Sequence, residues 1–181
     1  MMEKTRFYED AARYGGWLGI VEILFTVLGV WKSSGLVSLV HVAVFVTLLA
    51  VFTKRRTAMY AGEDGYSYGK CLKFIVCMSA FAGVLAGAYA IVASNFLYPE
   101  KFHEAIDNMV VMLSQTGLYA DTMLEQVKGF YEKMFFSPLW VVVVNVLSMV
   151  LEGTFFGLFV SAYARREPQM FGPEQENDDT I

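Results

Sequence analysis

Four long apolar stretches, separated by short polar segments, dominate the hydrophobic pattern of this chain. They cover residues 14–31, 36–53, 71–96 and 139–164. An α-helix rises about 1.5 Å per residue, so about 17–25 residues cross the hydrocarbon core of a bilayer. Backbone amides that face lipid must be paired within their own segment, so each stretch is predicted to be a helix. The pattern therefore predicts an all-α integral membrane protein, a four-transmembrane-helix bundle that occupies residues 14–164.

The segment between the third and fourth apolar stretches, residues 99–137, has a different periodicity. Apolar residues recur at helical spacing over residues 102–113, with charged residues on the other faces. Gly117 is expected to end this helix, and the capping-box spacing of Thr122 and Glu125 predicts where a second helix begins. We therefore expect an amphipathic helical hairpin that either folds over the bundle and the lipid headgroups or docks a partner or lipid.

The basic residues indicate how the helices are oriented. Lys and Arg near the ends of spans collect on the cytoplasmic side of membranes. Ten of the 14 basic residues fall on one predicted side, and the other four are Lys32, Lys101, Lys128 and Lys133. Residues 1–13 are therefore predicted to be a cytoplasmic N-terminal tail, and the acidic residues 165–181 a disordered cytoplasmic tail. The helical hairpin is then extracytoplasmic, and both termini of the multi-pass chain are cytoplasmic.

Small residues recur at helical spacing in three of the four stretches. Such residues let neighbouring helix backbones approach closely, so they mark packing seams in membranes. The predicted helix-packing seams contain Gly15, Gly19 and Gly29 in the first stretch, Gly83 and Gly87 in the third, and Gly153 and Gly157 in the fourth. Packing within one bundle and association of two copies of the chain are both open interpretations.

Three ionisable residues fall inside the apolar stretches, where a charge is costly. Counted from the predicted cytoplasmic ends, Glu22 lies about 12 Å deep, and His41 and Glu152 lie about 18 Å deep. Asn145 and Ser148 share a helix face with Glu152. We expect these five residues to form an intramembrane polar cluster. The open interpretations are interhelical contacts, a lipid-headgroup or partner contact, a proton-linked transport site and catalysis.

The sequence offers no motif for catalysis or cofactor binding. It contains no nucleophile elbow, no phosphate-binding glycine loop and no metal-ligand spacing. We therefore predict a non-enzymatic protein with no catalytic residue, no metal and no cofactor. The basic, tyrosine-rich loop after the second span suits anionic headgroups or a protein surface. The predicted contact patch for a partner or lipid consists of Arg55, Arg56, Tyr66, Tyr68 and Lys70.

Several local motifs resemble those of a known family. They are Gly-Tyr-Ser-Tyr-Gly at residues 65–69, Phe-Leu-Tyr-Pro at 96–99, Phe-Phe-Ser-Pro at 135–138, and Glu152 five residues before a glycine. With this order of spans, the chain resembles the bacterial membrane family called domain of unknown function 4199. The family pattern commonly has a proline near position 155, where this chain has phenylalanine, so a straighter fourth span is expected.

The resemblance implies a bacterial inner (cytoplasmic) membrane and no established activity. Members are often encoded near a polyprenyl-phosphate glycosyltransferase of the dolichol-phosphate mannose synthase type, which suggests that class of enzyme as a partner. The leading hypothesis is a non-enzymatic scaffold or accessory protein that binds a protein or lipid partner, not nucleic acid, in an envelope pathway. The alternative is an oligomeric proton-coupled carrier or lipid-handling subunit that uses Glu22, His41 and Glu152.

Overall fold

The computed structural model describes residues 2–31, 34–62 and 65–167, and these are helical along nearly their whole length. Of the predicted C-terminal tail, residues 168–181 lie outside the described residues. In chain order the helices are α1 (Met2–Trp31), α2 (Gly35–Tyr60), α3 (Tyr68–Val92), the π-helix η1 (Ala93–Leu97), α4 (Pro99–Gln115), α5 (Asp121–Phe136) and α6 (Pro138–Ala164).

Four of these helices are long and apolar enough to cross a membrane. They are α1, α2, α3 with its continuation to Leu97, and α6. The helical backbone extends beyond two of the apolar stretches, because α1 is already helical at Met2 and α2 continues to Tyr60. The chain is thus an all-helical protein in which basic residues such as Arg56 lie on the extended end of a candidate span.

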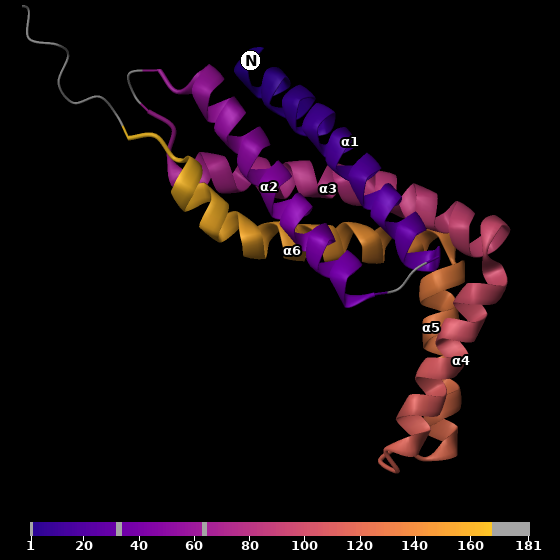
Figure 1. The fold of residues 1–181 in the computed structure, drawn as a ribbon. Helices are drawn as coiled ribbons and strands as arrows, with labels where there is room; N and C mark the ends of the chain where they lie inside the picture. The colour runs from indigo at the N-terminus through magenta and orange to yellow at the C-terminus, as the bar shows by residue number, and fades with distance from the viewer. Residues whose placement is uncertain (1, 32–33, 63–64, 168–181) are drawn as a thin grey trace, which may run out of the picture.

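Helix α3 occupies the centre of the bundle, between α1 and α6 (Figure 1). Helix α2 packs mainly against α6, and it contacts its sequence neighbour α1 only weakly. The core where these helices meet includes the fully buried side chains of Leu18, Phe45, Leu49, Phe74 and Met78. Because α1 packs mainly against α3 and α2 mainly against α6, space is left between α1 and α2.

Glycines bring α6 close to α3. A Cβ atom added at Gly83 would lie 2.6 Å from the Cα atom of Val146, and one added at Gly153 would lie 2.7 Å from a side-chain carbon of α3. At Gly87 and Gly157 an added Cβ would lie 3.0 Å from an atom of the opposite helix. A methyl group does not fit at the first two positions unless the helices move apart.

Glycines also bring α1 close to α3, but at only two of the three positions predicted in the first stretch. An added Cβ at Gly15 would lie 2.7 Å from that of Phe81, and one at Gly19 would lie 3.1 Å from the carbonyl oxygen of Ala82. At Gly29 an added Cβ would meet nothing within 4 Å. Gly29 instead lies on the wall of a cavity.

Helices α4 and α5 lie side by side and project away from one end of the bundle (Figure 1). The rings of Phe102 and Phe135 pack with centroids 5.7 Å apart, and Lys128 bonds to Asp107 at 2.7 Å. The predicted start of α5 at a Thr122 capping box is wrong. The helix begins at Asp121 and its N-cap is Ala120, two residues before Thr122; the carbonyl oxygen of Ala120 accepts bonds from the next turn.

At the opposite end of the bundle, where α2 ends and α3 begins, basic residues gather, and we call this the basic end. It includes Arg13, Arg55, Arg56, Lys70 and Lys73. The segment after α6 is fastened there, because Tyr66 and Arg166 exchange two backbone hydrogen bonds of 2.8 and 3.0 Å.

Candidate functional site

The central feature of the candidate site is a contact between Glu22 of α1 and His41 of α2. The Nε2 atom of His41 lies 2.9 Å from both carboxylate oxygens of Glu22. One nitrogen facing two acceptors suits an Nε2–H group that donates to both. Glu22 is buried at 8% exposure, so this bond satisfies a carboxylate that has little access to solvent or lipid.

Aromatic rings surround the histidine. Phe25 lies 4.8 Å from the ring of His41 between centroids, and Phe45 lies 6.5 Å from it. Phe45 in turn contacts Phe156 of α6 at 6.2 Å. The polar contact therefore stands in an apolar surrounding, where hydrogen bonds and charge interactions are stronger than in water.

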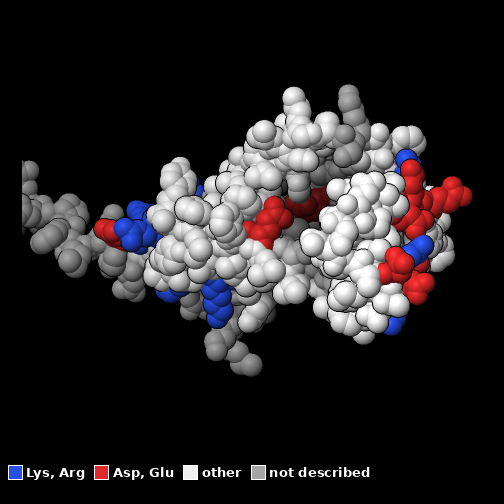
Figure 2. Space-filling view, turned by 90° about the horizontal axis from the view of Figure 1, so that it is seen from below, with Lys and Arg blue, Asp and Glu red and all other residues white. Residues whose placement is uncertain are grey.

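Glu152 of α6 belongs to the same region. It is half-buried, and it lies one helical turn before Phe156, whose ring contacts Phe45 beside His41. Figure 2 shows acidic side chains inside a hollow of this face of the bundle, surrounded by uncharged surface. Glu22 and His41 are thus in contact in the apolar part of the bundle, and Glu152 of α6 lies in the same region.

The other two predicted members of the cluster lie elsewhere. The amide of Asn145 donates at 2.8 Å to the carbonyl oxygen of Val141 in its own helix, and its Cβ atom faces Gly87 of α3. Ser148 is exposed. The structure therefore does not bring these two residues to the contact between Glu22 and His41.

Two neighbouring cavities lie along α1 near this contact. The first, about 210 Å³ in volume, lies between α1 and α2 and is lined by Glu22, His41 and Thr26. The second, about 410 Å³, lies between α1 and α4 and is lined by Lys101 and Glu104. Thr26 and Gly29 line both cavities, so the two cavities are neighbours along α1.

A second polar group lies at the basic end, around Arg56. This side chain is buried at 4% exposure, forms an ion pair with Asp10, and donates from Nε to the hydroxyl of Tyr66 at 3.1 Å. Its guanidinium also lies over the rings of Phe7, Tyr60 and Phe74 at 4.9, 4.5 and 4.8 Å. Burial raises the pKa of the Tyr66 phenol above its usual value, and the bond from Arg56 opposes that shift.

The remaining members of the predicted contact patch differ in accessibility. Arg55 and Lys70 are exposed. Tyr68 is half-buried, and its hydroxyl donates to the carbonyl oxygen of Leu158 at 3.2 Å. Sequence reasoning missed Asp10, which it placed in a tail; its position four residues before the buried Tyr14 is the signal that would have assigned it to the packed face of α1.

No group of three or more His, Cys, Asp or Glu side chains able to hold a metal ion is found in the described part of the chain. Four apolar helices around a polar contact define a multi-pass helical membrane protein. Residues 13–166 match the family described as "Protein of unknown function (DUF4199)", and the chain belongs to this family. No curated protein and no solved structure matches the chain.

The pair of Glu22 and His41 gives a testable stability effect. Replacing His41 by leucine leaves a buried carboxylate without its donor, so we expect a loss of about 1–3 kcal/mol in the free energy of unfolding. The double variant Glu22→Leu/His41→Leu should regain most of that loss, because no unpaired group remains. Unfolding in mixed detergent micelles measures both. Equal losses in the single and double variants would contradict the pairing.

Proposed function

We propose that this protein is a non-enzymatic membrane protein that binds a lipid or protein partner along α1. The observation that carries the proposal is the position of the cavities. Four cavities, of about 400, 410, 210 and 500 Å³, are each lined in part by α1. The three larger cavities fall in the size range of ligand pockets, and all four lie beside α1, which contacts its sequence neighbour α2 only weakly.

The chemistry of the cavity walls favours binding over catalysis. The walls combine aromatic and aliphatic side chains with a few basic or acidic groups, which is the usual composition of a recognition surface. Two of the ionisable groups that line a cavity, Glu22 and His41, are engaged with each other. We propose a bacterial inner membrane with both termini in the cytoplasm, so that the basic end faces cytoplasmic partners.

A polyprenyl-phosphate glycosyltransferase is the class of partner to test first. We expect tagged protein, extracted from native membranes, to retain a stoichiometric partner. Charge reversal of the exposed Arg55 and Lys70 to glutamate should release it. Arg56 is unsuitable for this test because it is buried. The control reverses Lys133, which is exposed on α5 and lines none of these cavities. Retention of the partner by the first variant, or equal release by both, would contradict docking at the basic end.

The alternative function, an oligomeric proton-coupled carrier or lipid-handling subunit, is favoured by one observation. Glu22 and His41 line a cavity within the apolar part of the bundle, and Glu152 of a third helix lies in the same region. Ionisable groups in that position are common in proton relays. A single monomer offers a thin wall for a solute path, so this function requires several copies.

Amide replacement distinguishes the two functions. We expect Glu22→Gln and Glu152→Gln to keep partner retention unchanged, because an amide preserves the shape and an acceptor oxygen for His41. Proton movement into liposomes that contain the purified protein, followed with a pH-sensitive dye, should equal that of empty liposomes. Proton-linked flux in the natural protein that disappears in Glu152→Gln, with folding intact, would replace the binding proposal by the carrier.

A further inference from the structure

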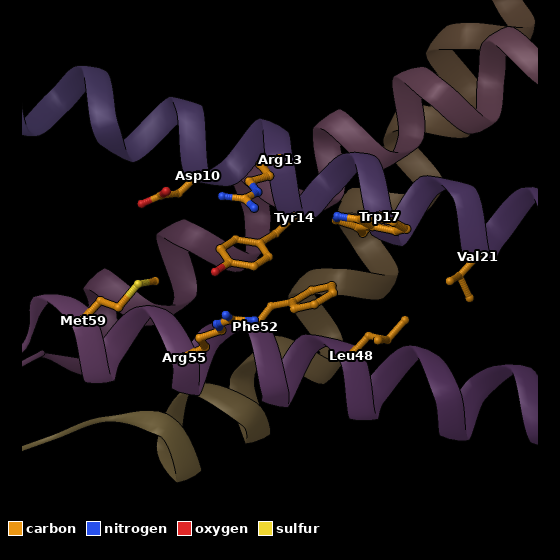
Figure 3. A pocket seen from close by; sticks show the side chains of 9 residues that line it. All are labelled: Asp10, Arg13, Tyr14, Trp17, Val21, Leu48, Phe52, Arg55 and Met59. Carbon is orange, nitrogen blue, oxygen red and sulfur yellow. The ribbon is translucent and has the colours of Figure 1, made fainter.

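We infer that the cavity between α1 and α2 at the basic end is a binding site for one anionic phospholipid. Its phosphate would lie between Arg13 and Arg55, and an acyl chain would lie along Trp17, Val21 and Leu48. This inference deepens the proposed function and rests on it, because it names the lipid and the site where α1 binds it. The cavity has a volume of about 400 Å³ and is formed by these two helices alone (Figure 3).

The charge of the cavity favours an anion. Arg13 projects from α1 and Arg55 from α2, so the two guanidinium groups line the same space from opposite walls (Figure 3). Among the described residues, neither has a carboxylate within 4.0 Å. The acidic residue of the wall, Asp10, is engaged by Arg56. Two arginines without acidic partners are well suited to phosphate oxygens, which they bind in bidentate geometry.

The rest of the wall favours a lipid over a free phosphate. Trp17, Val21 and Leu48 continue from the arginines into the apolar part of the two helices (Figure 3). Trp17 is 59% exposed, although it is a large apolar side chain beside a cavity. Tryptophan prefers the boundary between headgroups and acyl chains. Inorganic phosphate would leave this apolar surface uncovered, whereas a phospholipid would cover it with one acyl chain.

The position of the cavity agrees with the order of parts in a phospholipid. Basic side chains stand at the end of the bundle and aliphatic side chains stand deeper along the spans, so headgroup and chain meet groups of matching chemistry at each level. A neighbouring cavity at the same end is lined by other residues, among them Tyr8, Lys70 and Lys73. Its two lysines provide a matched comparison for the two arginines.

The test uses the full-length chain in a neutral detergent, titrated with phosphatidylglycerol, phosphatidylcholine or sn-glycerol 3-phosphate. Native mass spectrometry counts the molecules bound. We expect one phosphatidylglycerol per chain, bound about tenfold more tightly than phosphatidylcholine, because two basic groups face its extra negative charge. The soluble phosphate ester should not compete, because it cannot cover the apolar wall.

Four variants locate the site. Arg13→Gln/Arg55→Gln should lose the preference for phosphatidylglycerol, whereas Lys70→Gln/Lys73→Gln, with the same change of charge at the same end, should keep it. Val21→Phe should weaken both phospholipids without changing any charge, because it fills the acyl end of the cavity. Arg13→Lys/Arg55→Lys replaces the first variant if that variant unfolds, and it should weaken the preference several-fold, because a lysine cannot bind phosphate in bidentate geometry.

Each contrary result has one meaning. If Arg13→Gln/Arg55→Gln and Lys70→Gln/Lys73→Gln lose the preference for phosphatidylglycerol equally, anionic lipid is attracted to the basic end in general. That result would overturn the site. Competition by sn-glycerol 3-phosphate would show a free-phosphate site instead. If the arginine variants retain the full preference while partner retention in the membrane extract is intact, the lipid inference fails and the proposed function stands. If partner retention fails and the lipid preference is found, lipid is the ligand of α1 and the protein partner is excluded.

Discussion

Valine in place of Gly83 is expected to lower the free energy of unfolding by about 3 kcal/mol or more, the upper part of the range for overpacked interiors. The Cβ atom alone would lie 2.6 Å from the Cα atom of Val146, and backbone cannot rotate away as a side chain does. The two helices must therefore separate, which loses the close packing that holds helices together in a membrane. Unfolding in mixed detergent micelles, followed by circular dichroism, measures the loss.

The same substitution at Gly16 is the matched control. Gly16 lies on α1 beside Gly15, and a Cβ atom added there would meet nothing within 4 Å. Valine at Gly16 should change stability by less than about 0.5 kcal/mol. Similar losses at both positions would show that helix propensity rather than the contact between α3 and α6 determines the effect.

At Gly153, unlike at Gly83, a second substitution on the facing helix is expected to restore the lost stability. Its added Cβ would meet the side chain of Ser79, with 2.7 Å between the Cβ atoms. Gly153→Ala should therefore lose about 1–3 kcal/mol, and Ser79→Gly in the same chain should restore much of it, because the obstructing atoms are then absent. At Gly83 no side-chain change on α6 removes the obstructing Cα atom. Failure of the rescue would mean that the helices contact each other differently from this geometry.

Much of the fold is predictable from the sequence because a membrane-spanning segment must pair its own backbone and face an apolar surrounding. Length and hydropathy are therefore enough to find the four long helices. The helix ends are less predictable. Residues 2–13 lie before the apolar stretch of α1 and residues 54–60 lie after that of α2, yet both are helical. Their helices continue because side chains such as Ala11 and Arg56 are buried there, and hydropathy does not register that packing.

The candidate site was predictable only in part. Glu22 and His41 are in contact, although counting along their spans placed them at different depths. Asn145 was expected beside Glu152 because the two residues share a helix face, but a separation of seven residues is about 10 Å along the axis. The amide of Asn145 is also satisfied by the carbonyl oxygen of Val141, so nothing draws it toward the other polar groups. Periodicity gives the direction of a side chain and leaves its contacts undetermined.

The ion pair of Arg56 and Asp10 was missed for a related reason. Counting basic residues near span ends treats each as a surface charge, and Arg56 is one of three consecutive basic residues in the sequence. Only the packing of α1 against α2 and α3 separates it from its exposed neighbours Lys54 and Arg55. One buried arginine among exposed ones can be distinguished by the partners it meets in three dimensions, and those partners lie far apart along the chain.

Replacement of Arg56 by glutamine is expected to cost about 3–5 kcal/mol of stability, because one partner of a buried ion pair is removed. Asp10 would lose its cation, Tyr66 its donor, and the rings of Phe7 and Tyr60 the guanidinium that lies over them.

Arg56→Lys should recover only part of the loss, because an ammonium group cannot keep the planar contact with the rings while it bonds to both oxygens. The control is Arg55→Gln, one residue away and exposed, which should change stability by less than about 0.5 kcal/mol. Unfolding in mixed detergent micelles compares the three variants. Full recovery with lysine would mean that positive charge alone, rather than the fixed guanidinium geometry, stabilises the basic end.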